Sequence, residues 1–307
     1  MLARLSTERA TEYKSDLLSE QHSGERRGAL EAYWNHRTIP FGAFFSLLLV
    51  AATAQGQPAI PKSRMTPEEQ EAFLLNATIV GETALASGAS RVSLVDGQRE
   101  HDASLKTWDS RDPLQVDYKS NVAAYELDQL LELNLVSPSV ERTVNGRPAA
   151  LTWWVDDVLM DELSRRRQNI GPPELHRWTQ QMQAVRVFDE LIANAYRSMS
   201  PSSYLSTVWD NLLITREWRI WLIDHTRAFG TSRQLQYPES LTQCDRAVLA
   251  RLRAPNREAL ERQVGRFLTS AQVAALDARR ALIVKHFDEH IARKGESVVL
   301  YDVSSRR

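Results

Sequence analysis

Cysteine and glycine are scarce in this chain, and neither sign of charge is in excess. The single cysteine, Cys244, excludes an intrachain disulfide, a cysteine-rich zinc site and a CxxC redox motif. With only 12 glycines in 307 residues, no glycine-rich phosphate loop is obvious. Lys+Arg 38 against Asp+Glu 39 argues against a general nucleic-acid binder, which would show a basic excess. The 43% hydrophobic and 25% charged residues instead indicate a globular protein of one large or two small domains.

One long stretch near the N-terminus carries no charge. Residues 38–61 lack charged side chains, and their centre, Phe41–Ala54, is continuously apolar. The basic flank His36-Arg37, the short apolar core and the small-residue end Ala52-Thr53-Ala54 are typical of an export signal. The core is short for a membrane span, which needs about 20 residues.

Because a long leader precedes the apolar core, either the true start lies downstream of Met1 or the segment is an uncleaved anchor. A buried core helix is the alternative. Either export interpretation places the remainder outside the cytoplasm, periplasmic or extracellular.

The remainder shows strand and helix signals first and then mostly helix signals. Two hairpins are predicted, one turning at Asp96-Gly97 and one at Asn145-Gly146, the strongest short turn signal. Capping boxes at Thr66-Glu69 and Thr269-Gln272 predict helix starts, the second opening a helix to about Lys294. Further helices are expected after the capping residue Ser120 and over residues 172–195. This order predicts an α+β fold with three parts: a leader with an export signal or anchor at 1–57, a small strand-rich lobe at 65–160 and a helical lobe at 161–307.

Glu126 has apolar neighbours where a carboxylate is costly. Val122 and Leu130 lie four residues away on either side, so Glu126 belongs to the helical stripe that should face the core. A buried carboxylate needs a partner, and Lys106 on the expected strand 102–108 is the best candidate. The alternative is that Glu126 lies at the edge of its helix and that Lys106 is an ordinary exposed lysine.

Asn211 and Asp224 bracket a third expected hairpin. If Glu217-Trp218 form a two-residue turn, position 216 pairs with 219, and counting outward sets 211 opposite 224. An amide and a carboxylate side by side offer only oxygen ligands, which suit Mg²⁺. The alternative is a pair of Asx-turns that close the hairpin.

Several stretches together resemble an uncharacterised bacterial family with an atypical protein-kinase-like fold, whose relatives include HipA kinases, secretory-pathway kinases and phosphatidylinositol kinases. The resemblance runs from about Met65 to the C-terminus, and Leu222–Phe229 is its most distinctive part. The stretches that carry it are 101–103, 118–128, 140–146, 153–157, 186–192, 210–214 and 221–229. The resemblance implies a two-lobed kinase-like fold, with a small strand-rich N-lobe and a mostly helical C-lobe.

The same resemblance implies roles for individual residues. Asn211 and Asp224 would bind Mg²⁺, Asp224 in the position of the kinase aspartate that holds the metal on the phosphates. Lys106 looks like the nucleotide lysine and Glu126 like the glutamate that pairs with it. The catalytic aspartate is missing, because Tyr196 stands at its position, and the loop before Asp210 is longer than the family's. A tyrosine, with a pKa of about 10, cannot replace the carboxylate near neutral pH.

Three functions follow as hypotheses. The first is an exported pseudokinase or weak phosphotransferase that keeps a site for ATP and Mg²⁺. The second is an active kinase that uses Asp210 as a relocated catalytic carboxylate on an unknown protein or small-molecule substrate. The third is a non-enzymatic interaction module of the cell envelope, which the export signal favours because ATP is scarce outside the bacterial cytoplasm.

Overall fold

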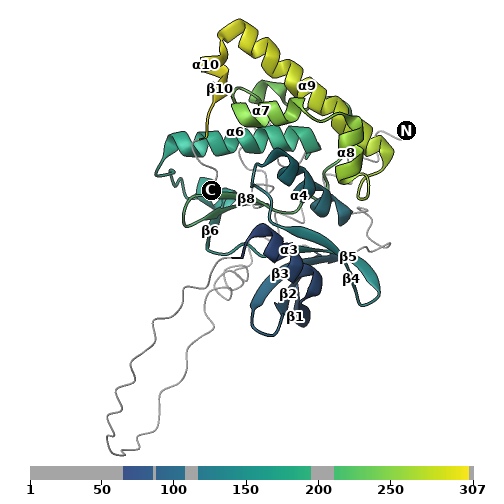
Figure 1. Cartoon of the computed structure of the whole chain (residues 1–307). Coiled ribbons are helices and arrows are strands. Elements are labelled where there is room, and N and C mark those ends of the chain that lie inside the picture. Colours follow the sequence, from purple (N-terminus) through teal and green to yellow (C-terminus); the bar gives the residue numbers. More distant parts are fainter. Residues whose placement is uncertain (1–64, 86–87, 108–116, 195–210, 304–307) are drawn as a thin grey trace, which may run out of the picture. The chain divides into compact units, whose positions relative to one another are not determined.

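The computed structural model of the chain describes residues 65–85, 88–107, 117–194 and 211–303. The predicted leader, with its apolar stretch Phe41–Ala54, lies outside these residues. Within the described ranges, no helix combines the length and the apolar character that crossing a membrane requires. Strands dominate the first half of the described chain and helices the second, so the α+β class is confirmed (Figure 1).

A five-stranded antiparallel sheet with the order β1-β2-β3-β5-β4 forms the first part. Its strands are β1 (Thr78–Ala84), β2 (Ser90–Val95), β3 (Glu100–Thr107), β4 (Ser139–Val144) and β5 (Arg147–Trp153). Helix α3 (Pro67–Asn76) packs in one hydrophobic cluster with Ala149 and Leu151 of β5, whereas Ala150 belongs to the cluster of α4 (Lys119–Leu131). Because successive residues of a strand point to opposite faces, α3 and α4 lie on opposite faces of the sheet.

Local sequence signals explain most of these elements. Thr66 caps α3 in a capping box with Glu69, and Asn145-Gly146 turns β4 into β5 with φ of 51° and 75°. The prediction that Ser120 caps the next helix is wrong, because α4 begins at Lys119 and buries Ser120 inside its first turn. Strand β1, which no sequence pattern indicated, is exposed along almost its whole length, so it lacks the apolar alternation that marks a half-buried strand.

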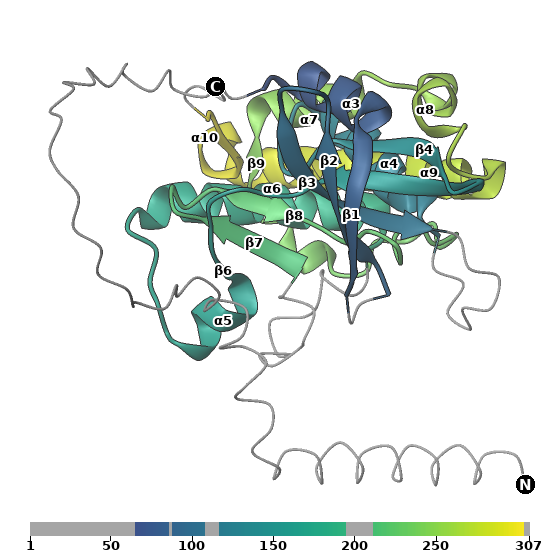
Figure 2. The ribbon, with the colours of Figure 1, turned by 90° about the horizontal axis from the view of Figure 1, so that it is seen from below.

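A second, three-stranded sheet has the order β6-β7-β8, from strands Val158–Asp161, Leu212–Thr215 and Ile220–Leu222. Figure 2 shows α5 (Glu162–Arg167) beside the β6 edge of this sheet, and α6 (Leu175–Ile192) follows α5 in the chain. The predicted two-residue turn between β7 and β8 is wrong. Three residues, 216–218, separate Thr215 from Arg219, and Trp218 takes the left-handed conformation with φ of 59°.

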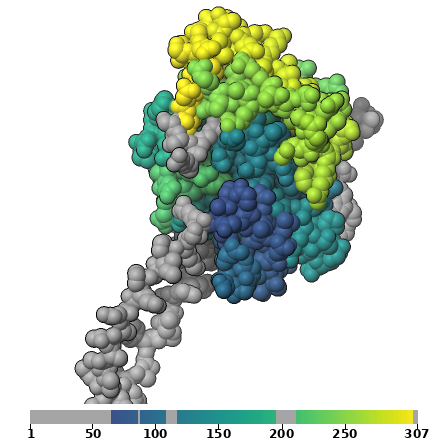
Figure 3. Space-filling model, viewed as in Figure 1, coloured from purple at the N-terminus to yellow at the C-terminus, as the bar shows by residue number. Residues whose placement is uncertain are grey.

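Helices complete the chain after β8. They are α7 (Arg246–Arg253), α8 (Arg257–Val264), α9 (Ser270–Lys294) and the short α10 (Glu296–Val299), with a two-stranded pairing of β9 (Cys244–Asp245) and β10 (Leu300–Tyr301). As predicted, Thr269 and Gln272 form the capping box of α9, which ends before Gly295. Helix α8 contacts both α4 and α9, and the space-filling view shows the green and yellow helices beside α4 (Figure 3).

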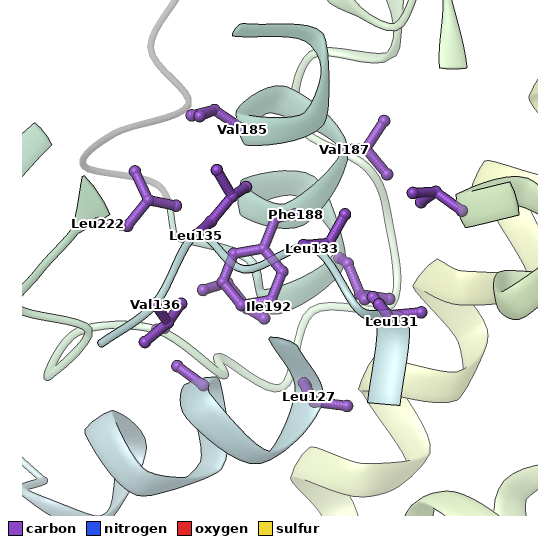
Figure 4. Close-up of a cluster of buried hydrophobic side chains, with 14 of the residues drawn as sticks. Leu127, Leu131, Leu133, Leu135, Val136, Val185, Val187, Phe188, Ile192 and Leu222 are labelled. Atoms are coloured by element: carbon purple, nitrogen blue, oxygen red, sulfur yellow. The ribbon is translucent and has the colours of Figure 1, made fainter. Parts of the chain in front are cut away.

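The larger hydrophobic cluster joins α4 and α6 to the second sheet. Leu127 and Leu131 of α4 meet Phe188 and Ile192 of α6, with Leu222 of β8 at the side (Figure 4). The link between α4 and β4 adds Leu133, Leu135 and Val136 to this core, and Leu135 accepts the N–H of Leu222 at 2.8 Å. Strand β8 is therefore fixed by packing against α4 and by a backbone hydrogen bond to the link that follows α4, just before the predicted metal ligand Asp224.

Candidate functional site

Asp224 lies immediately after β8 in an unusual backbone conformation. Its φ is 52°, in the left-handed region that non-glycine residues rarely adopt, and its side chain is exposed. The Oδ1 atom accepts hydrogen bonds from the hydroxyl and the backbone N–H of Thr226, the Asx-turn geometry that was the alternative to a metal ligand. The neighbours His225 and Thr226 are buried. The buried residues His225 and Thr226 thus follow an exposed carboxylate. Its Oδ2 atom has no hydrogen-bond partner among the described residues.

The register of the β7–β8 hairpin differs by one residue from the predicted one. Leu212 pairs with Leu222, and the N–H of Ile223 donates to the carbonyl of Asn211 at 3.1 Å, so Asn211 lies opposite Ile223 rather than Asp224. In a continuous strand a slip of one residue would turn Asp224 to the other face of the sheet. The left-handed turn at Asp224 ends the strand instead, so the alternation of faces does not extend to it. Asn211 and Asp224 remain close along the same hairpin end, and their joint metal site stays a prediction.

One face of this hairpin is only half-covered. Leu212 and Ile214 face the core, so Leu213 shares the other face with Asn211, and Trp221 is its cross-strand partner. Leu213 and Trp221 are both half-exposed. The guanidinium of Arg219 lies over the ring of Trp221, 4.1 Å from its centroid, so Leu213 is the apolar residue of this pair next to Asn211 that is left for a ligand. The amide and carboxylate oxygens suit a hard cation. Within the described chain, no group of three or more His, Cys, Asp and Glu side chains could hold a metal, so any such ion would need ligands from its substrate as well.

Lys106 lies on the face of the five-stranded sheet that α4 covers. It pairs with Ala150 across β5, and Ala150 belongs to the hydrophobic cluster of α4. Its Nζ atom approaches the turn between β1 and β2, since a Cβ built on Gly88 would be 3.8 Å away. Gly88 has φ of 73°, a conformation that favours glycine. A lysine under a glycine-containing turn is an arrangement suited to holding an anionic group.

Glu126 does not pair with Lys106, so this sequence prediction is wrong. The Glu126 carboxylate instead accepts a hydrogen bond of 2.6 Å from Gln263 of α8. Burial raises the pKa of Glu126, and the hydrogen bond from Gln263 opposes that shift. The apolar neighbours at four-residue spacing correctly indicated a partly buried face. That face, however, packs against helix α8, which no spacing argument within α4 could have identified.

Asn121 is the residue of α4 that reaches the Asp224 segment. Its Oδ1 atom accepts a hydrogen bond of 2.8 Å from the backbone N–H of His225. Sequence reasoning missed Asn121 because an asparagine in the first turn of a helix is ordinary and its partner lies 104 positions away. A polar side chain beside the buried Val122 and Ser120 was the available signal.

A second connection joins α4 to the same segment through Asp128. This carboxylate is fully buried, and its Oδ1 atom accepts the N–H of Leu135 at 2.9 Å. Leu135 in turn accepts the N–H of Leu222, two residues before Asp224. Burial raises the pKa of Asp128 to about 7. Helix α4 therefore holds both sides of Asp224, through Leu222 before it and His225 after it.

The chain that follows Asp224 is fixed to α6 and α9. The N–H of Phe229 donates to the carbonyl of Ile192 at 2.6 Å. The fully buried Arg279 of α9 donates to the carbonyls of Leu191 at 2.8 Å and Gly230 at 3.0 Å, and also to that of Ser232. These bonds fix the start of the segment after Asp224.

The far end of the segment is fixed by a carboxylate. Glu190 of α6 accepts the N–H groups of Gln236 at 2.7 Å and Tyr237 at 3.0 Å. Burial raises the pKa of Glu190, and these two hydrogen bonds oppose the shift. Residues 229–237 are thus held at both ends. Two residues of the predicted site, Tyr196 and Asp210, lie outside the described residues.

Comparisons with known proteins add little to this picture. No protein-family model matches the chain, and no curated protein matches it. Among solved structures, the proinflammatory kinase CtkA of Helicobacter pylori matches with 14% sequence identity and a TM-score of 0.36, over 72% of this chain and 93% of that one. A similarity this weak assigns neither fold nor activity, so any function has to be argued from the geometry of the chain itself.

Proposed function

We propose that the chain is a kinase-like protein that binds Mg²⁺ and a nucleotide such as ATP and transfers phosphate weakly or not at all. The observation that carries the proposal is the exposed Asp224 carboxylate, held in a left-handed conformation by Thr226 and by the Asn121–His225 hydrogen bond. Backbone strain maintained by its surroundings is concentrated at functional sites in proteins. Asn211 at the other strand end supplies a second oxygen ligand, and Lys106 beside Gly88 supplies a cation for phosphate oxygens.

The two-lobed arrangement belongs to the same proposal. The cluster around α3 and the five-stranded sheet would be the core of the small lobe, and the cluster around α4, α6 and α9 that of the large lobe. In this arrangement the nucleotide lies between Lys106 and the outer face of the β7–β8 hairpin, with its base on Leu213. Weak transfer follows from Tyr196, which cannot accept the proton of a substrate hydroxyl as an aspartate does.

Binding is tested by a thermal-shift titration of the full-length protein with Mg²⁺ and ATP. A ligand that binds only the folded protein raises the melting temperature by mass action. We expect wild type to respond, and Asp224→Ala and Lys106→Met to lose the response. Asp96→Ala is the matched control, because Asp96 is also a turn carboxylate, at the opposite end of β3. A wild-type protein that ignores Mg²⁺–ATP would exclude the nucleotide site.

Turnover is tested separately, by phosphate release and autophosphorylation. We expect wild type to be nearly inactive and Tyr196→Asp to gain activity if the new carboxylate reaches the nucleotide. Robust wild-type turnover that Asp224→Ala abolishes and Asp210→Ala preserves would contradict the pseudokinase interpretation. Turnover that Asp210→Ala abolishes would instead assign the catalytic carboxylate to Asp210.

Export of the chain remains a prediction from its N-terminal segment. A fusion of residues 1–57 to a reporter that is active only outside the cytoplasm should give signal. A second fusion that starts just before Arg37 tests the downstream start. Silence from both fusions would place the nucleotide site in the cytoplasm, where ATP is abundant, and would weaken the case for an envelope module.

A further inference from the structure

Two histidines of α9 lie one turn apart on the same face of the helix. His286 and His290 are four residues apart in the sequence, a spacing that places two side chains next to each other on a helix. Their ring centroids are 4.2 Å apart, and the ring planes are tilted by 31°. Both residues are half-buried, so solvent still reaches the pair.

The hydrogen bond of His286 defines which of its nitrogens carries a lone pair. Its Nε2 atom lies 2.9 Å from the carbonyl oxygen of Leu241. Because a carbonyl oxygen only accepts, Nε2 carries the proton, and in the neutral ring the lone pair is on Nδ1. A histidine that binds a metal through one nitrogen commonly donates the other N–H to a backbone carbonyl, which fixes the tautomer and the orientation of the ring. His286 already makes this supporting bond.

His290 makes the same kind of bond within its own helix. Its Nδ1 atom lies 3.1 Å from the carbonyl oxygen of His286, and a proton on Nδ1 leaves the lone pair on Nε2. Nη2 of Arg293 lies 3.2 Å from the same Nδ1 atom, and because a guanidinium only donates, this contact competes with the first. The carbonyl is fixed in the helix, whereas Arg293 is exposed and its side chain can move away. Burial lowers the pKa of His290, and the bond to His286 only partly opposes this shift, which favours the neutral ring near pH 7.

We propose that His286 and His290 together bind one transition-metal ion of the Zn²⁺ type, through Nδ1 of His286 and Nε2 of His290. Imidazole nitrogens suit Zn²⁺, and with zinc–nitrogen bonds of about 2.0–2.1 Å one ion joins two nitrogens up to about 4 Å apart. Two rings with their centroids 4.2 Å apart are close enough for this. In the part of the chain that the structure describes, no third His, Cys, Asp or Glu side chain completes a metal site, so water would fill the other positions.

A bound ion would join two successive turns of α9. Through the bond from His286 to Leu241 it would also hold the helix against the segment that precedes β9. The site is independent of the proposed nucleotide site, because it uses nitrogen ligands and neither Lys106 nor Asp224.

The test is isothermal titration calorimetry of the full-length protein with ZnCl₂. Excess MgCl₂ is present throughout, so that it occupies oxygen-ligand sites such as the one proposed at Asp224. We expect wild type to bind zinc, and His286→Gln and His290→Gln each to weaken the apparent affinity about tenfold or more, because the second ring binds the same ion intramolecularly. Each single variant should lose almost as much affinity as the double variant.

Two controls locate the ion. His176→Gln removes an exposed histidine of α6 whose neighbour four residues on is Gln180 rather than a second histidine, and this variant should bind zinc like wild type. Asp224→Ala should also keep the zinc response. If His290→Gln fails to fold, as judged by circular dichroism, His290→Ala replaces it.

Arg293→Met tests the assigned nitrogens. It removes a positive charge and the donor that competes for Nδ1 of His290, so zinc should bind several-fold more tightly. Unchanged or weaker binding by Arg293→Met would contradict the assignment. The proposal is overturned if wild type takes up no zinc, if the His286 and His290 variants bind zinc like wild type, or if each removes one of two separate zinc ions.

Discussion

Asn121 and His225 are joined by a hydrogen bond of 2.8 Å between the side-chain oxygen of one and the backbone N–H of the other. This contact connects helix α4 to the residue that directly follows Asp224. Asp224 adopts a left-handed conformation, so the direction of its carboxylate depends on how the backbone of His225 is held. Helix α4 therefore helps to position the candidate metal ligand through the residue that follows it.

The first prediction concerns Asn121. Asn121→Ala should weaken binding of Mn²⁺, a spectroscopic substitute for Mg²⁺, several-fold and should cost about 1–2 kcal/mol of stability, because the N–H of His225 loses its acceptor. Asn121→Asp keeps an acceptor oxygen and should bind Mn²⁺ nearly as well as wild type. Paramagnetic resonance titrations and denaturant midpoints measure the two effects. Equal Mn²⁺ affinity in wild type and Asn121→Ala would show that α4 does not position Asp224.

Helix boundaries and turns could be predicted because their signals are local. The capping boxes at Thr66 and Thr269 and the Asn145-Gly146 turn satisfy or direct backbone groups within a few residues, and the structure confirms all three. The hairpin register after Asn211 was mispredicted for a local reason too. The left-handed position of the three-residue loop is taken by Trp218, although aromatic residues rarely adopt this conformation. The loop therefore lacks the glycine that would have marked this position in the sequence.

Partners across the fold could not be predicted in the same way. Periodicity indicated that Glu126 is partly buried, but Gln263 approaches it from a helix more than a hundred residues later. The contact of Asn121 with His225 is equally remote in sequence. Such contacts depend on how helices pack, and spacing within one helix contains no information about what packs on it.

A double-mutant cycle should confirm that Glu126 and Lys106 act independently. Glu126→Gln and Lys106→Met are expected to change the unfolding free energy additively, with a coupling within about 0.5 kcal/mol, because no hydrogen bond or ion pair joins Glu126 to Lys106. The matched cycle of Glu126→Gln with Gln263→Ala should show clear coupling. A coupling energy between Glu126 and Lys106 that is larger than the one between Glu126 and Gln263 would support the predicted ion pair.

Asp128 should make stability depend on pH. Burial raises its pKa from 3.8 to about 7, so between these values the folded protein holds a proton that the unfolded chain has released. Stability is therefore lost as pH rises from about 4 to 7, on the order of a few kcal/mol for one fully buried group. Asp128→Asn keeps the oxygen that accepts the N–H of Leu135 and removes the ionisation.

The pH profile of that variant is the decisive measurement. The free energy of unfolding of Asp128→Asn should increase relative to that of wild type as pH rises toward 8, and the two should differ little near pH 4. Asp288→Asn, an exposed carboxylate of α9, should follow the wild-type profile. A stability difference between Asp128→Asn and wild type that stays constant across this range would show that folding does not shift the pKa of Asp128.

Arg279 should be essential for the order of the segment after Asp224. The guanidinium is fully buried and donates to the carbonyls of Leu191, Gly230 and Ser232, so Arg279→Met leaves the buried carbonyl of Leu191 without this donor and releases the carbonyls of Gly230 and Ser232. We expect a loss of about 3 kcal/mol or more in the free energy of unfolding, typical of removing one partner from a buried polar network. Hydrogen exchange should accelerate at residues 229–237 far more than in the five-stranded sheet, because the segment is then held only by the bond from Phe229 to Ile192 at its start and by the two bonds that Glu190 accepts at its end. Lys285→Met, an exposed residue of the same helix, is the control and should change neither quantity.

Uniform acceleration of hydrogen exchange over all described elements would mean that Arg279 supports the whole fold rather than this segment. Accelerated exchange confined to 229–237, together with weaker Mn²⁺ binding at Asp224, would show that the segment and the candidate metal site are ordered together.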